Sequence, residues 1–170
     1  VPGAFGPTVD IRGDGNPPVA PTDHPVLTDV RVRQAMAYCT DKEAMVAAAY
    51  PGLTQGQREA LILDTFIHPD SWAYTAPTTT YPYNPTAGMS LLDAAGWTLP
   101  MGGDYRMKDG KELALTLTAG DSPLRQTIVS EFSAQMAICG IRIVANLQPG
   151  GWWFKDDAGL AVRDFELGEF

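Results

Sequence analysis

The segment KDGKELALTLTAGDSPLRQTIVSEFSAQMAICGIRIV, from Lys108 to Val144, decides the fold of this chain. Within it, Leu113 to Thr118 alternates leucine with smaller or polar residues, which is the period of a half-buried strand. Ser122 then precedes a proline at the first helical position, so we predict a helix over Pro123 to Cys139. A second strand is predicted over Ile141 to Leu147. The order strand, helix, strand predicts a right-handed crossover between neighbouring parallel strands.

The sequence around this unit predicts its core and its neighbours. We expect the inner face of the long helix to be apolar, with Ile128, Val129, Phe132, Met136 and Cys139 on it. Upstream, Met107 to Gly110 ends in Asp-Gly, which tolerates the positive dihedral angles of a tight hairpin turn. Downstream, the alternation of Asp164 to Phe170 predicts a further strand that contains Phe165 to Leu167.

Three more helices are expected on the amino-terminal side. The first begins at Thr28 or Asp29 and buries a stripe that consists of Val32, Ala35, Met36 and Cys39. Thr40 to Glu43 resembles a capping box, so a second helix is predicted from about Asp41 to Tyr50. The third is predicted over Pro85 to Ala95, with Asn84 as its cap and Gly96 as its end.

Two stretches rich in proline and glycine are predicted to be irregular. Residues 1–28 are expected to form an arm over the surface. Residues 52–83 combine prolines with Trp72, Tyr74, Tyr81 and Tyr83, so we expect a long loop that its rings pin to the surface.

Composition limits the class of protein. With 170 residues, 45% of them hydrophobic, one domain with its own core is expected. The net charge of -8, with twelve basic residues scattered among twenty acidic ones, argues against nucleic acid binding, which requires clustered Lys and Arg. No apolar run approaches the roughly 20 residues that span a bilayer, and no leader-like segment opens the chain, although a signal or lipid anchor before Val1 stays open.

Cys39 and Cys139 are the two cysteines, and both fall on apolar faces of predicted helices. The favoured interpretation is that both are small buried hydrophobic residues without a bond between them. A disulfide is the less favoured alternative, because it requires Cα atoms within about 7 Å of each other. A metal site is not expected, since no Cys or His stands at ligand spacing from another.

The sequence contains none of the common catalytic or cofactor-binding motifs. His24 and His68 are the two histidines, and each lies beside a proline in a predicted loop. A hydrolase would need at least Glu166 or Glu169 near His68. We therefore expect no enzyme, no catalytic residue and no cofactor.

Three segments carry a resemblance to a known family: DVRVRQAMAYCTDKEAMV from Asp29 to Val46, YPYNPTAGMSLLDAAGW from Tyr81 to Trp97, and the strand, helix and strand of Lys108 to Val144. Together they resemble the family 5 extracellular solute-binding proteins of ABC importers. The resemblance implies an α/β fold, namely one lobe of a type II periplasmic-binding-protein fold with a mixed sheet and packed helices. It also implies capture of a small solute, peptide-like in the first instance, and delivery to a membrane permease.

Proteins of that family have two lobes, so residues 1–170 are expected to be a single α/β lobe of a longer protein, much of its carboxyl-terminal lobe. An extracytoplasmic location is implied, either periplasmic or as a cell-surface lipoprotein. We expect the isolated lobe to bind solute weakly and to self-associate through surface that the other lobe covers.

The resemblance also suggests ligand-binding residues. By its spacing from the Phe165 strand, Trp153 stands where relatives carry a cleft tryptophan, and Trp152 adjoins it. Glu169 stands where a relative carries a basic cleft residue, and an acid there favours a cationic ligand group. The alternatives are a motif-poor hydrolase and a structural interaction module, and peptide, oligosaccharide, metal chelate and opine all stay open as solutes.

Overall fold

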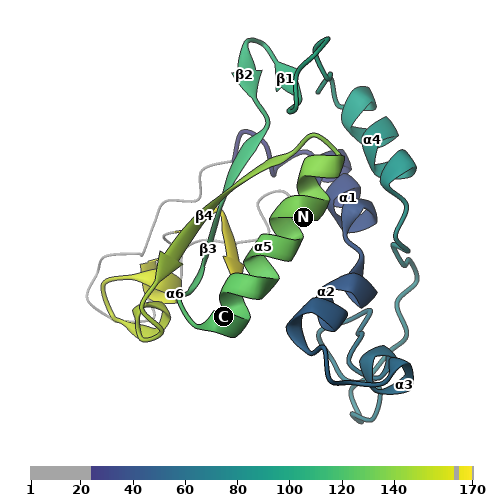
Figure 1. Cartoon of the computed structure of the whole chain (residues 1–170), viewed down its shortest axis with the longest axis vertical. Helices are drawn as coiled ribbons and strands as arrows, with labels where there is room; N and C mark the ends of the chain where they lie inside the picture. Colours follow the sequence, from purple (N-terminus) through teal and green to yellow (C-terminus); the bar gives the residue numbers. More distant parts are fainter. Residues whose placement is uncertain (1–23, 163–164, 170) are drawn as a thin grey trace.

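The computed structural model describes residues 24–162 and 165–169 as an α/β unit (Figure 1). The predicted arm over residues 1–28 therefore lies mostly outside the described residues, and only its turn at residues 24–28 is seen. No helix in this part of the chain is both long and apolar enough to cross a bilayer. The elements are α1 Val30–Cys39, α2 Lys42–Ala49, α3 Gln55–Glu59, α4 Pro85–Ala94, β1 Met107–Lys108, β2 Lys111–Glu112, β3 Ala114–Gly120, α5 Pro123–Ile138, β4 Arg142–Gln148, η1 Trp152–Phe154, α6 Gly159–Val162 and β5 Leu167–Glu169.

The predicted crossover is confirmed. β3 pairs in parallel with β4 along its whole length and with β5 near its carboxyl end, giving the order β4-β3-β5. This sheet is parallel throughout the described residues. The antiparallel component of the predicted mixed sheet lies in the separate β1-β2 hairpin, where Asp109 and Gly110 both have positive φ angles, as the Asp-Gly turn requires.

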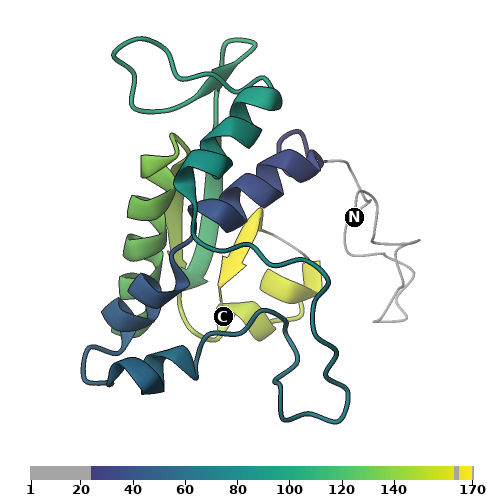
Figure 2. The same ribbon diagram turned by 90° about the vertical axis from the view of Figure 1, so that its right-hand side faces the viewer.

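The two faces of the sheet differ in chemistry. One face is apolar: Leu117 and the partly buried Leu167 pack with Val129 of α5. Leu115 on the same face belongs to a larger cluster with Val32, Met36 and Met136. In both views α5 lies on one side of the sheet and the η1 and α6 segment on the other (Figures 1 and 2). Phe132, which we expected on the inner face of α5, is only partly buried but contacts both clusters.

The favoured interpretation of the cysteines, that no bond joins them, is wrong. Cys39 and Cys139 form a disulfide, with Cα atoms 6.4 Å apart and a sequence separation of 100. They were correctly placed on buried helix faces, but the folded chain brings the ends of α1 and α5 together. Gly88 of α4 packs against this bond, because a Cβ there would lie 2.5 Å from the Cys39 sulfur. The disulfide therefore lies where three helices meet.

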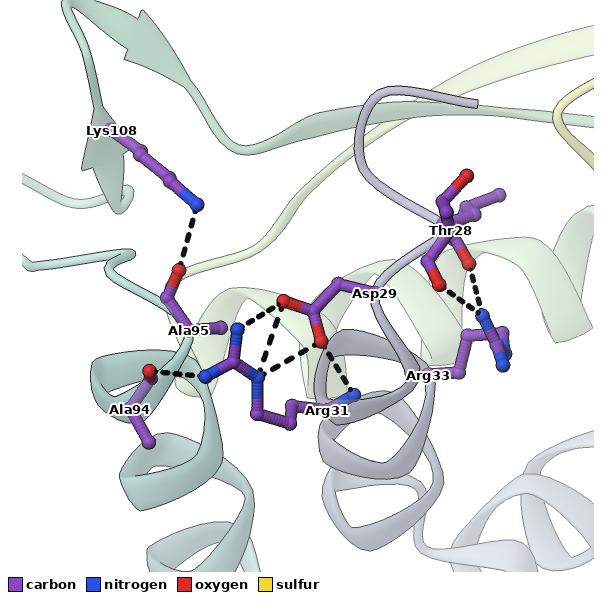
Figure 3. Close-up of polar contacts among 8 residues, drawn as sticks. Thr28, Asp29, Arg31, Arg33, Ala94, Ala95 and Lys108 are labelled. Carbon is purple, nitrogen blue, oxygen red and sulfur yellow. Dashed lines mark hydrogen bonds and ion pairs between the residues drawn. The ribbon is translucent and has the colours of Figure 1, made fainter. Parts of the chain in front are cut away.

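Two basic side chains, from α1 and β1, bind the carboxyl end of α4 (Figure 3). Arg31 donates to the carbonyl of Ala94 at 2.6 Å, and Lys108 donates to that of Ala95 at 2.9 Å. Positive charge is favourable here because the last carbonyls of a helix lack intrahelical partners. Arg31 also pairs with Asp29, the cap of α1, and its side-chain hydrogen bond lowers the pKa of that carboxyl. The pair thus ties the start of α1 to the end of α4.

Two local predictions need correction. Asp41, not Thr40, caps α2: its carboxylate accepts from the amide of Ala44, while the Thr40 hydroxyl donates back to Met36. The segment over residues 52–83 is not a continuous loop, because Thr54 starts the short helix α3 with a capping box that involves Gln57. The aromatic rings of this segment differ in their contacts. Tyr81 packs edge-on against Tyr38, whereas Trp72 is 98% exposed and does not anchor the segment.

Candidate functional site at the carboxyl edge of the sheet

The carboxyl ends of the three parallel strands define the candidate site. Gly120, Gln148 and Glu169 end β3, β4 and β5, and α5 begins at Pro123, three residues after Gly120. Ligands of open α/β sheets bind outside this edge, because the loops that follow the strands meet there. The edge carries an aromatic cluster, an ion pair and a row of polar side chains.

The aromatic cluster follows β4. Trp152, Trp153 and Phe154 form the single turn η1, and the Trp153 ring makes edge-to-face contacts with Trp152 and with Phe165, both at 5.1 Å between centroids. Trp153 is 2% exposed, Trp152 is partly buried and Phe154 is 74% exposed. Gly168 of β5 allows this packing, since a Cβ there would lie 2.8 Å from the Trp153 ring. Trp153 therefore holds η1 against the sheet.

The ion pair joins β5 to α5. Arg125 Nη1 lies 2.6 Å from Glu169 Oε1, and both side chains are partly buried, at 34% and 24% exposed. The arginine stem passes over Gly120, where a Cβ would lie 2.7 Å from Arg125 Cδ. Among the described residues, the second carboxylate oxygen of Glu169, Oε2, is buried without a hydrogen-bond partner. A buried acceptor in this state is costly unless a further donor reaches it.

A row of polar side chains crosses the face of the sheet opposite α5. Gln148 donates to Asn146 at 2.8 Å, and Asn146 donates to the Thr118 hydroxyl at 3.2 Å. Thr118 is 1% exposed, whereas the two amides are half-buried. Parallel strands covered on both faces are usually apolar throughout, so this row is an unusual feature of the edge. It offers both donors and acceptors.

All three residues predicted to bind ligand lie at this edge. Trp152 and Trp153 follow β4, and Glu169 ends β5. Glu169 pairs with Arg125. Glu169 lies on the same face of β5 as Leu167, which packs into the core. Contact of these residues with a solute stays a prediction.

Sequence reasoning missed Arg125 and the polar row. The signal for Arg125 was a basic residue in the first turn of a helix, where the dipole disfavours positive charge. The signal for Thr118, Asn146 and Gln148 was polar residues at the alternate positions of strands that should be buried on both faces. Neither signal identifies the partner that the side chain meets.

The histidines do not form the pair that a hydrolase would need. His68 lies near Asp70, at 3.5 Å, while Glu169 pairs with Arg125. Glu166 instead meets His24, whose Nε2 lies 2.9 Å from Oε1, and its Oε2 accepts from the amide of Thr116 at 2.5 Å. His24 Nδ1 accepts from the amides of Val26 and Leu27. Nε2 therefore carries the proton, and His24 ties the turn before α1 to β5.

Burial raises the pKa of Glu166, but the hydrogen bonds from Thr116 and His24 outweigh it, so the net pKa lies below its ordinary value. Within residues 24–162 and 165–169, no group of three or more His, Cys, Asp or Glu side chains is arranged to hold a metal ion.

The fold defines the class: the chain has the α/β architecture of part of a type II periplasmic binding protein. It belongs to the family described as bacterial extracellular solute-binding proteins, family 5 Middle, whose model matches residues 16–167. The resemblance read from the three sequence segments is thereby confirmed.

The chain is also similar to individual proteins of known name or structure. The chain is 29% identical over 113 residues to a nickel-binding periplasmic protein of Escherichia coli, a match that covers 66% of this chain and 20% of that protein. The structure of NikA from Brucella suis in complex with Fe(III)-EDTA matches with a TM-score of 0.64 and 26% identity, over 75% of this chain and 25% of the other. The oligopeptide-binding protein AppA of Bacillus subtilis shares the fold, with a TM-score of 0.64 and 24% identity over 74% of this chain and 24% of its own. The chain thus spans about a fifth of the length of the curated relatives it matches.

Proposed function

We propose that this chain is one lobe of the substrate-binding component of an ABC importer. The observation that carries the proposal is family membership over residues 16–167, joined to a carboxyl edge that concentrates polar and aromatic side chains. The lobe supplies one wall of a cleft, a second lobe supplies the other, and closure buries the solute between them. No covalent step is involved. Its partners are the solute, peptide-like in the first instance, and a membrane permease.

The disulfide supports an extracytoplasmic location. Disulfides persist in oxidising compartments such as the periplasm or the cell surface, and both cysteines of this chain are bonded. The nickel-binding relative is a periplasmic protein by its name. Anchoring as a lipoprotein belongs to the same proposal.

Within the cleft wall, Trp152 and Glu169 are proposed to contact the solute, and Trp153, which is 2% exposed, is proposed to hold the Trp152 ring in place. Trp152 has the more open ring of the tryptophan pair, with Trp153 packed behind it. Glu169 Oε2 is the buried acceptor that a donor group of the solute would satisfy, with Arg125 holding the other oxygen. We expect the donor to be cationic or an N–H group.

The test is calorimetric titration of the two-lobe protein that contains this lobe, with a panel of peptides, oligosaccharides, nickel chelates and opines. One solute should bind, and Glu169→Gln should weaken it by about 1.5–3 kcal/mol, the scale of a hydrogen bond to a charged group. Asp104→Asn, an exposed acid on the segment that leads into the hairpin, is the matched control. Failure of every solute class to bind would overturn the function, whereas binding that Glu169→Gln and Trp152→Ala leave unchanged would remove only the residue assignments.

A further inference from the structure

A groove separate from the sheet edge lies between the start of α2 and the segment that precedes α4. It encloses about 320 Å³. Its lining falls into two kinds: charged residues Asp41, Lys42, Glu43 and Asp64, and apolar or aromatic residues Ile62, Tyr81, Pro82 and Tyr83, joined by Thr40 and Thr80. The groove plays no part in the site described above. Arg125 belongs to the site, and Gln135 contacts Asp41 of the groove; the two residues are ten positions, or about 15 Å, apart along α5.

Buried and bridging contacts fix both walls. Gln135, 4% exposed, accepts from the amide of Asp41 at 2.8 Å and donates to its carbonyl at 3.2 Å, which fixes the start of α2. On the opposite wall, Tyr81 packs on Tyr38 at 5.2 Å between ring centroids and accepts from Gln34. The groove is therefore preformed, and a ligand would lose little free energy in ordering it.

The charges of the groove favour a cation. Three carboxylates line it beside a single lysine. That lysine is engaged: Lys42 donates to the carbonyl of Leu63 at 2.9 Å and pairs with Asp64 at 3.0 Å. Glu43 is exposed and has no partner among the described residues. Tyr81 and Tyr83 add aromatic faces, which attract cationic groups through their quadrupoles.

The segment that forms one wall also has the surface of an interface. It carries Phe66, 97% exposed, and Trp72, 98% exposed, as well as Leu61, 50% exposed. These side chains give the segment exposed apolar area that a protein partner can bury. This observation is independent of the charges in the groove.

We propose that this groove docks a basic segment of a partner protein, whose lysine or arginine side chains meet Glu43 and Asp64 while its apolar residues pack on Tyr83 and Ile62. The occupant is a cationic polypeptide because the groove joins net negative charge to aromatic walls. The proposal does not depend on solute binding at the sheet edge, since the two places lie at different ends of α5.

The experiment measures binding of a fluorescently labelled short peptide of alternating arginine and leucine to the chain of residues 1–170, by fluorescence anisotropy. A peptide with glutamate in place of arginine is the control ligand. We expect saturable binding of the arginine peptide alone, weakened by added salt because the pairs are solvent-accessible. Glu43→Gln and Asp64→Asn should each weaken it by about threefold to fivefold. Tyr83→Ala should weaken it by about tenfold.

Asp104→Asn is the matched control for Asp64→Asn, because it removes the same charge from the segment that enters the β1-β2 hairpin, at the end of the molecule opposite α3 (Figure 1). It should leave the affinity unchanged. Thermal unfolding midpoints equal to wild type confirm that each variant is folded. No saturation up to about 1 mM peptide, equal binding of the glutamate peptide, or equal weakening by Asp104→Asn would overturn the proposal.

Discussion

The segment from β3 to β4 and the segment between α3 and α4 differ in what holds them in place. The first is a parallel crossover whose Leu115 is 1% exposed, and a disulfide joins the end of its helix to α1. The second contains no strand and has nearly fully exposed aromatic rings, and it is attached through a few contacts such as Lys42 with Leu63 and Tyr81 with Tyr38. Stability therefore resides in the first segment, and the second provides exposed surface.

The largest expected effect comes from removal of the disulfide. Cys39 and Cys139 close a long loop of chain, so Cys39→Ala with Cys139→Ala should lower the free energy of unfolding by about 4–5 kcal/mol. Urea unfolding of the variant and of wild type in reductant measures this loss, and the two should agree. A loss below about 1 kcal/mol would show that packing alone holds α1 to α5.

The next prediction compares the same substitution, leucine to alanine, in the core and in the loop. Leu115→Ala should cost about 3 kcal/mol, because it leaves a cavity under α5. Leu63→Ala, at a side chain 36% exposed in the loop, should cost less than about 1 kcal/mol. Chemical denaturation of both variants measures the difference. Equal losses would mean that the loop contributes to the core as much as the sheet does.

A smaller effect tests the packing around the disulfide. Gly88→Ala normally favours a helix, yet here the new Cβ would lie 2.5 Å from the Cys39 sulfur and 2.9 Å from the Ala35 carbonyl oxygen. We expect a net loss of about 1–2 kcal/mol from overpacking. Gly56→Ala in α3 is the control, because nothing lies within 4 Å of its Cβ position, and it should be neutral or stabilising. Thermal unfolding compares the two, and a stabilised Gly88→Ala would contradict close contact between α1 and α4.

The smallest expected effect is the pH dependence from Glu166, which joins β5 to the turn before α1. Its pKa in the folded chain lies below the ordinary value of 4.5, so the carboxylate stabilises the fold at pH values above 4.5. This contribution is lost as the pH falls through the folded pKa. Glu166→Gln should therefore lower the unfolding midpoint at pH 7, with the gap to wild type closing in acid.

The sequence predicted where the site residues lie but not which side chains they contact. The family resemblance predicted Trp152, Trp153 and Glu169 as ligand-binding residues, and the parallel pairing of the strands brings all three to the carboxyl edge of the sheet, where contact with a solute stays a prediction. Arg125 as the partner of Glu169 was not predictable, since the two residues are 44 apart in sequence and only the register of β5 on β3 brings them together. The polar row on the opposite face depends on the same register.

The sequence by itself determined the local elements: the strand, helix and strand of Leu113 to Leu147, the helix that starts at Asn84, and the Asp-Gly turn. Periodicity, capping residues and turn residues act within a few positions, so a single sequence displays them. The tertiary structure alone decided that Cys39 meets Cys139, that Trp153 is buried against Gly168, and that an acidic aromatic groove forms beside α2. Each of these features joins segments that are distant in sequence. The packing of helices and the pairing of strands bring such segments together in space, and no local sequence pattern encodes that packing.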